Sequence, residues 1–270
     1  MINKNVKIVL INSLEGIELK DNCYSIECGK ADNIHHFDHH GEFSNFPSPC
    51  NNNKVPRLDK NVFNTIYISH IDSDTAIALR KMLTGCKFGG DAEIVELIDN
   101  NGSSIIKDKF DWNLLYTIGI TTKARELNFP RVTQEQQDVT ELIFKLINFM
   151  NIHEDVVRLG RETQEKSENS YKECLEQNDN GIFFINQKEG YQVDPSRAYE
   201  DGANIVIMYR ECWKTISIYC NPNTKYEFAE KTINNITFGG HPKACGSPRG
   251  MQFNLEDARK VYNEIVNTIK

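Results

Sequence analysis

Histidine and aspartate gather in three short segments of this chain. Six of the seven histidines lie in the segments IHHFDHHG, SHIDSDTA and FGGHPKACG. Asp38, Asp72 and Asp74 stand beside the histidines of the first two segments. Imidazole nitrogens and carboxylate oxygens together suit Mn²⁺, Mg²⁺ or Fe²⁺ better than a structural zinc ion. The clustering therefore predicts a divalent metal site, against the alternative of a surface histidine run with acidic neighbours.

The segment SHIDSDTA follows a predicted buried strand at 64–70 and opens a predicted helix at 75–85. This position is the carboxyl edge of a sheet, where open α/β folds bind ligands. His70, Asp72 and Asp74 are spaced by two, so an extended loop would project them to one side. Asp74 could instead cap the helix, but a cap accounts for one of the three residues only. We therefore expect all three to bind metal, with Asp74 also taking part in catalysis.

The segment IHHFDHHG ends a short β-like run in the same way. Asp38 and His39 are predicted to complete the metal sphere from a neighbouring strand. His40 would then be the catalytic residue that meets a substrate oxygen. His35 and His36 are either partners of the metal ligands or plain strand residues, and both alternatives stay open.

A glycine-rich loop near the C-terminus, FGGHPKACGSPRG, predicts an anion-binding site. Gly239 and Gly240 allow close approach of the backbone to an anion before His241. Arg249 offers a bidentate fork for phosphate or carboxylate. The alternative is an ordinary Gly/Pro turn between a helix and a strand.

Short β-branched runs alternate with helical stretches over residues 1–151. The expected strands are 7–12 and 64–70, the expected helices are 75–85, 92–101 and 132–151, and 112–121 fits either a strand or a helix. This alternation predicts a doubly wound α/β domain with a mainly parallel sheet.

The remainder of the chain predicts a connector and a second domain. Residues 152–179 are strongly charged and suit an exposed helical connector. Residues 180–270 predict a smaller α+β domain. Its expected β-rich runs are 181–187, 204–212 and 213–220, and its expected helices are 227–237 and 255–270.

The composition of the chain indicates which classes of binding partner to expect. A net charge of −7 argues against the broad basic surface that long nucleic acids require. The first apolar run, of only about six residues, is too short for a signal sequence or a membrane span. Eight scattered cysteines without a CxxC pair suggest reduced thiols. We therefore expect a cytoplasmic protein with no membrane partner, and a homodimer is left open.

Three segments together resemble the DHH superfamily of phosphoesterases with its associated C-terminal domain. The matching segments are DHH at 38–40, HIDSD at 70–74 and GGHPKACG at 239–246, which is similar to the signature GGGHxxAAG. The resemblance implies a centre of two metals, usually Mn²⁺, in the N-terminal domain. It also implies a smaller domain that closes on a short phosphorylated substrate such as a small nucleotide.

The chain departs from that family pattern in three ways. HIDSD follows the triplet, whereas it usually precedes it. Asn12 is expected where the family has a metal-bridging aspartate, at the end of the strand before the triplet strand. Lys123 is expected where a later segment has another aspartate, and its ammonium could occupy the position of a cation. Because of these departures, the sequence does not fix whether the centre holds two metals, one metal or none.

The leading hypothesis is a metal-dependent phosphoesterase that hydrolyses a small nucleotide or other short phosphorylated substrate with metal-activated water. His40, His241 and Arg249 would stabilise charge on the phosphoryl oxygens. The alternative is a degenerate member that binds a nucleotide or metal without turnover. A third hypothesis is a metal-dependent hydrolase of another bond.

Overall fold

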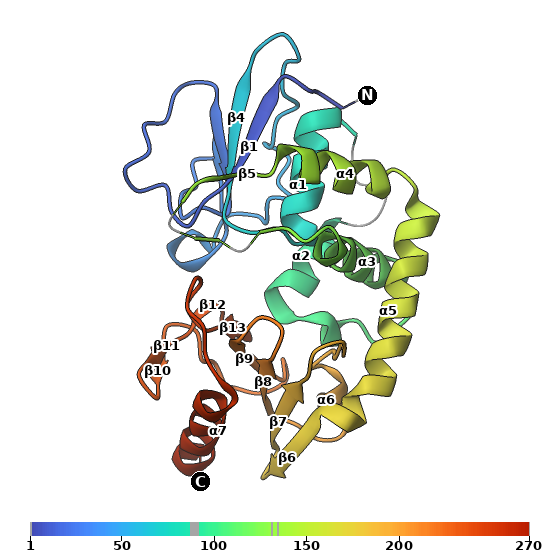
Figure 1. Ribbon diagram of the computed structural model, residues 1–270, viewed down its shortest axis with the longest axis vertical. Coiled ribbons are helices and arrows are strands. Elements are labelled where there is room, and N and C mark those ends of the chain that lie inside the picture. Colours follow the sequence, from blue (N-terminus) through green and yellow to red (C-terminus); the bar gives the residue numbers. More distant parts are fainter. Residues whose placement is uncertain (1, 87–91, 131, 134, 270) are drawn as a thin grey trace. The chain divides into compact units, whose positions relative to one another are not determined.

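The computed structural model describes residues 2–86, 92–130, 132–133 and 135–269 (Figure 1). The chain divides into two compact units. The first unit comprises Met1–Glu96 and Phe110–Arg161, and the second comprises Leu97–Lys109 and Glu162–Lys270. Each unit has its own sheet.

The first unit is built on a five-stranded sheet with the order β3-β2-β4-β1-β5. Its strands are β1 (Val6–Leu10), β2 (Cys23–Ile26), β3 (His36–Phe37), β4 (Asn64–Ile68) and β5 (Gln137–Asp138). All neighbours pair in parallel except β5, which runs antiparallel to β1 at the edge. The predicted mainly parallel α/β sheet is confirmed. Because β3, β2 and β4 are adjacent and parallel, the residues that follow them meet at one edge.

The two faces of this sheet are covered differently. Helices α1 (Ser73–Thr84) and α4 (Thr140–Met150) lie on one side of β1 and β4 and bury the larger apolar cluster (Figure 1). On the other face, Leu14 and Ile17 of the loop after β1 pack against a small apolar cluster of Val9, Ile11 and Cys28. Helices α2 (Ala92–Asn101) and α3 (Trp112–Glu126) lie between α1 and α4 in the chain.

Helix α1 begins and ends as its sequence dictates. The Asp72 side chain accepts a hydrogen bond from the Thr75 N–H and caps the helix, so the cap is Asp72 and not Asp74. Gly85 ends the helix in the left-handed conformation with φ 72°. The predicted helical stop at Gly85 is confirmed.

Two further segments of the first unit refine the predictions. Residues 112–121 belong to helix α3, which resolves the strand-or-helix alternative. The helix predicted at 132–151 starts only at Thr140, so this prediction was wrong at its N-terminal end. The cause is the sheet edge, where the Val139 N–H donates to the Ile8 carbonyl at 2.9 Å and the Ile8 N–H donates to Thr140 Oγ1 at 2.8 Å.

The predicted connector at 152–179 is helical over most of its length. It forms α5 (His153–Cys174), and its last residues form strand β6 (Leu175–Asp179). One face of α5 is buried at intervals of three or four residues, as is shown by Val156, Gly160, Gln164, Ser167, Tyr171 and Cys174. This helix is therefore part of the packed structure and not only a solvated link.

The second unit holds a six-stranded sheet with the order β12-β13-β9-β8-β7-β6. The strands after β6 are β7 (Ile182–Gln187), β8 (Ile205–Arg210), β9 (Thr215–Cys220), β12 (Gly239–His241) and β13 (Ala244–Gly246). Only β7 and β8 pair in parallel. Helix α7 (Leu255–Ile269) packs on one face, and α6 (Arg197–Glu200) with the end of α5 packs on the other. The predicted α+β fold of the second unit is confirmed.

The prediction of a helix at 227–237 was wrong. These residues contain a hairpin of β10 (Thr232–Ile233) and β11 (Ile236–Thr237). Asn234 and Asn235 both have positive φ angles, 48° and 60°. Two consecutive residues with positive φ form the tight turn that joins twisted strands. An α-helix cannot accommodate these φ angles.

No helix among the described residues combines the length and the apolar character needed to cross a membrane. All eight cysteines lie within the described residues, and none of them forms a disulfide there.

Candidate metal centre

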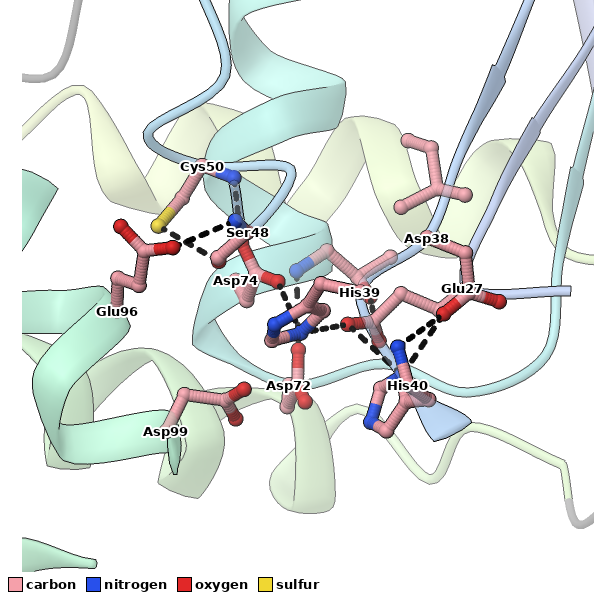
Figure 2. Close-up of polar contacts among 12 residues, drawn as sticks. Glu27, Asp38, His39, His40, Ser48, Cys50, Asp72, Asp74, Glu96 and Asp99 are labelled. Atoms are coloured by element: carbon pink, nitrogen blue, oxygen red, sulfur yellow. Dashed lines mark hydrogen bonds and ion pairs between the residues drawn. The ribbon is translucent and has the colours of Figure 1, made fainter. Parts of the chain in front are cut away.

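Seven acidic and histidine side chains converge where strands β2, β3 and β4 end, and Figure 2 labels all of them except His70. They are Glu27 after β2; Asp38, His39 and His40 after β3; and His70, Asp72 and Asp74 after β4. The parallel register of the three strands brings their carboxyl ends level. Six of the seven had been proposed from the sequence, and the structure brings all six together.

Glu27 is the member that sequence reasoning missed, and it lies at the centre of the cluster. Its Oε1 lies 3.0 Å from His39 Nε2, and its Oε2 lies 2.7 Å from His70 Nε2. The Thr75 hydroxyl donates to Oε2 at 3.1 Å. Its side chain is 1% exposed. Glu27 thus links the two histidine-bearing segments.

The position of Glu27 corrects the expectation about Asn12. The strand hydrogen-bonded to the triplet strand β3 is β2, and β2 is followed by Glu27. Strand β1, which precedes Asn12, pairs with β4 and β5 instead. The proposed loss of a carboxylate at Asn12 was therefore wrong, because Glu27 supplies one at the strand next to the triplet.

The backbone of Glu27 is held in an unusual conformation. Its φ is 56°, in the left-handed region that non-glycine residues rarely adopt. The Glu27 N–H donates to the Phe37 carbonyl at 2.8 Å, and the Ser69 hydroxyl donates to the Glu27 carbonyl. Such a conformation persists only where its surroundings enforce it, commonly at functional sites.

Glu27 is ionised despite its burial. Burial alone would raise the pKa of this carboxyl group, but the charge of His70 and hydrogen bonds with His39 and His70 hold the pKa well below its usual range. A buried carboxylate thus faces two imidazoles.

Asp38 and His40 form a second contact within the cluster. Asp38 Oδ2 accepts from the Gly29 N–H at 2.6 Å, and Oδ1 lies 3.0 Å from His40 Nδ1. Burial alone would raise the pKa of Asp38. The hydrogen bonds from His40 and Gly29 lower this pKa by more than burial raises it, so the pKa falls below its ordinary value. Asp38 therefore orients the His40 ring, whose side chain remains 28% exposed.

His70 and Asp72 converge on the same point as Glu27. His70 Nε2 lies 2.9 Å from Asp72 Oδ2. One ligand atom from each of Glu27, His70 and Asp72 can be chosen so that all three lie within 4.8 Å of one another. These atoms form a compact set of metal-ligand size.

Asp74 joins the cluster from the first turn of α1. It is fully buried. Its Oδ2 lies 3.5 Å from His39 Nε2, and its Oδ1 accepts from the Cys50 N–H at 2.5 Å (Figure 2). The carboxylate is thus fixed on one side and faces the histidines on the other.

The charge balance of the cluster favours a cation. Four carboxylates face three imidazoles. Even with every imidazole protonated, one negative charge would remain in a largely buried space. Mixed carboxylate and imidazole donors suit a divalent ion, which would compensate this charge. The residues present therefore fit a divalent metal.

Three other residues considered for the site serve elsewhere. His36 Nδ1 lies 2.8 Å from Ser25 Oγ within the sheet, and burial lowers its pKa. The His35 ring packs on Tyr24. His36 thus belongs to β3, and His35 immediately precedes that strand. Lys123 Nζ lies 3.0 Å from Glu126 on α3, so the expectation that its ammonium replaces a cation was wrong.

The glycine-rich segment forms a hairpin in the second unit. Gly239, Gly240 and His241 make up β12, which pairs antiparallel with β13. Gly240 has φ 124°, and a Cβ there would lie 3.0 Å from the Ala244 carbonyl oxygen. The segment therefore joins two strands, and not a helix and a strand.

His241 has a carboxylate neighbour that its local sequence did not suggest. Its Nε2 lies 3.2 Å from Asp99 Oδ2 within the second unit. Arg249 is exposed in the loop after β13. The hairpin thus presents an imidazole next to a carboxylate, with an arginine nearby in the sequence.

No model of a known protein family matches the chain, and no curated protein matches it by sequence. Solved structures with some likeness include a pGpG-specific phosphodiesterase, PggH, from Vibrio cholerae, with 16% identity, a TM-score of 0.41, and coverage of 93% of this chain and 99% of that one. An exopolyphosphatase-related protein from Bacteroides fragilis has 15% identity, a TM-score of 0.29, and coverage of 86% and 63%. An uncharacterised protein from Helicobacter pylori G27 has 15% identity, a TM-score of 0.25, and coverage of 65% and 53%.

Proposed function

We propose that the protein is a divalent-metal-dependent phosphoesterase. The observation that supports this proposal is the buried cluster of four carboxylates and three imidazoles at the ends of β2, β3 and β4. Mn²⁺ is the preferred ion because the donors mix imidazole nitrogen with carboxylate oxygen. The proposed metal-holding residues are Glu27, Asp38, His39, His70, Asp72 and Asp74. A divalent ion held there would supply Lewis-acid activation of water and of a phosphoryl oxygen.

The exposure of individual side chains suggests where a substrate approaches. Glu27 and His39 are almost completely buried, whereas the side chains of His40, His70 and Asp72 are 28%, 25% and 26% exposed. These three residues form the open side of the cluster. His40 is held through Nδ1 by Asp38, which suits a catalytic residue that must meet a phosphoryl oxygen in a fixed orientation.

The substrate we propose is a small nucleotide or another short phosphorylated molecule. The acidic balance of the chain, −7, disfavours long nucleic acid. Gly239, Gly240, His241 and Arg249 of the second unit are the proposed substrate-binding residues. Eight free thiols fit action in the reducing cytoplasm.

The degenerate, non-catalytic alternative has lost its main support. It rested on the loss of two carboxylates, at Asn12 and Lys123. Glu27 restores a carboxylate beside the triplet strand, and Lys123 pairs with Glu126 instead of facing the cluster. The observations therefore favour an active centre.

Elemental analysis followed by an activity assay tests this function. Purified protein should contain or take up Mn²⁺, and it should hydrolyse bis(p-nitrophenyl) phosphate only when the ion is present. Activity should fall after chelation and return with Mn²⁺. A panel of dinucleotides, mononucleotides and long single-stranded DNA would then define the substrate class. Protein that binds Mn²⁺ but hydrolyses no member of the panel would refute the enzymatic proposal.

A further inference from the structure

A buried loop outside the cluster fixes one of its carboxylates. Within residues 48–52, Ser48, Cys50 and Asn52 are 0%, 6% and 1% exposed. The Cys50 N–H donates to Asp74 Oδ1 at 2.5 Å. Asp74 is itself fully buried, so this bond limits the directions in which its second oxygen can point. The position of the Cys50 N–H therefore sets the orientation of Asp74.

Glu96 on α2 holds this loop from outside the cluster. Its Oε1 accepts from the Ser48 N–H at 2.7 Å, and its Oε2 accepts from Asn51 Nδ2 at 2.6 Å. The two contacts lie on either side of Cys50 in the sequence (Figure 2 shows Glu96, Ser48 and Cys50). One carboxylate thus holds both flanks of the residue that binds Asp74.

The far end of the loop is anchored independently of Glu96. Lys81 Nζ donates to the Asn52 carbonyl at 2.9 Å, and Asn52 Nδ2 donates to Asn33 Oδ1 at 2.6 Å. Pro47 and Pro49 restrict the φ angles of the first half. Loss of the Glu96 contacts should therefore loosen the Cys50 N–H without releasing the whole loop.

We propose that Glu96 is a positioning residue of the metal centre. Through Ser48 and Asn51 it fixes the Cys50 N–H, which in turn aims Asp74 at the ion. This inference rests on the proposed function, because it takes Asp74 as a metal ligand. Removing a group that orients a metal ligand typically lowers metal affinity by about 10- to 100-fold.

Mn²⁺ titration of the full chain, followed by electron paramagnetic resonance, tests the inference. Glu96→Ala should weaken Mn²⁺ binding by about tenfold or more. Glu96→Gln should keep most of the affinity, since its amide oxygen can accept from the Ser48 N–H and the Asn51 amide can turn to meet its NH₂ group. An equal loss in both variants would mean that only the charge of Glu96 matters, which would overturn the positioning role.

Matched variants complete the test. Glu141→Ala on α4 removes an exposed carboxylate and should bind Mn²⁺ as the wild type does. Asn51→Asp sets a second carboxylate against Glu96 and should weaken Mn²⁺ binding even if Glu96→Ala does not fold. The unfolding midpoint without metal, measured for each variant, separates lost affinity from lost stability.

The possible failures are distinguishable. If the wild-type chain binds no Mn²⁺, the proposed function fails. If the wild type binds Mn²⁺ and Asp74→Asn binds it weakly, but Glu96→Ala and Asn51→Asp bind normally, the positioning inference alone fails. Unchanged binding by Asp74→Asn would also overturn the inference, while leaving a metal centre built on the other residues.

Discussion

The Glu27→Gln substitution tests the centre at the residue with the most contacts. Gln keeps the shape of Glu27 but removes its charge. One negative charge would be lost from a set in which the ligand atoms of Glu27, His70 and Asp72 lie within 4.8 Å of one another. Mn²⁺ affinity should therefore fall while the fold persists.

The size of this effect follows from the spacing of the charges. A unit charge and a doubly charged ion about 4 Å apart interact by roughly 8 kcal/mol at an effective dielectric constant of about 20. At about 1.4 kcal/mol per factor of ten, this energy would correspond to more than about 10⁵-fold in affinity. The remaining amide oxygen and the partly exposed side of the cluster reduce the loss, so we expect a decrease of about 100-fold or more.

The assay is a calorimetric or spectroscopic Mn²⁺ titration of wild type, Glu27→Gln and a control. Glu15→Gln removes an exposed carboxylate from the loop after β1 and should not change affinity. Circular dichroism without metal should show the same secondary structure for all three proteins. Wild-type affinity in Glu27→Gln, within about threefold (under 1 kcal/mol), would refute the central role of this residue.

Three further outcomes are expected. The double variant Asn12→Asp and Lys123→Asp should leave the Mn²⁺ stoichiometry unchanged by elemental analysis, because neither position adjoins the triplet strand; a gain of bound metal would contradict this topology. Gly160→Ala should lower the free energy of unfolding in urea by about 3 kcal/mol, because its Cβ would lie 1.8 Å from the Leu115 carbonyl oxygen; unchanged stability would contradict the close packing of α3 and α5. His241→Ala should raise KM without reducing metal content, and released metal would disprove a substrate-binding role.

Hydrophobic periodicity predicted the main elements of the first unit. The buried run at 7–12 overlaps β1, the run at 64–70 contains β4, and the helix before Gly85 is α1. Helix α3 was ambiguous because three consecutive residues within it, Leu114, Leu115 and Tyr116, are buried, so no single apolar face marks a helix. Its N-cap gave the missing signal, since the Asp111 side chain accepts from the Asn113 N–H at 2.8 Å.

Very short strands escaped prediction for a physical reason. Strands β5, β10 and β11 have two residues each, too few for an alternating pattern to emerge. Their pairing depends on partners elsewhere in the fold or on a tight turn. Glu27 was missed for a related reason: it is a single acidic residue after the four-residue strand β2, and no histidine lies beside it in the sequence. Only the neighbouring strands reveal its role.

The order of the motifs along the chain matters less than the order of strands in the sheet. Ile26 of β2 is level with Phe37 of β3 and with Ile68 of β4. The next residues, Glu27, Asp38 and Ser69, therefore come level at the carboxyl edge, and His70 follows at once. A parallel sheet gathers these ends whichever strand comes first in the chain. HIDSD can thus follow the triplet and still meet it at this edge, whereas Asn12 follows β1, which is separated from β3 by β4 and β2.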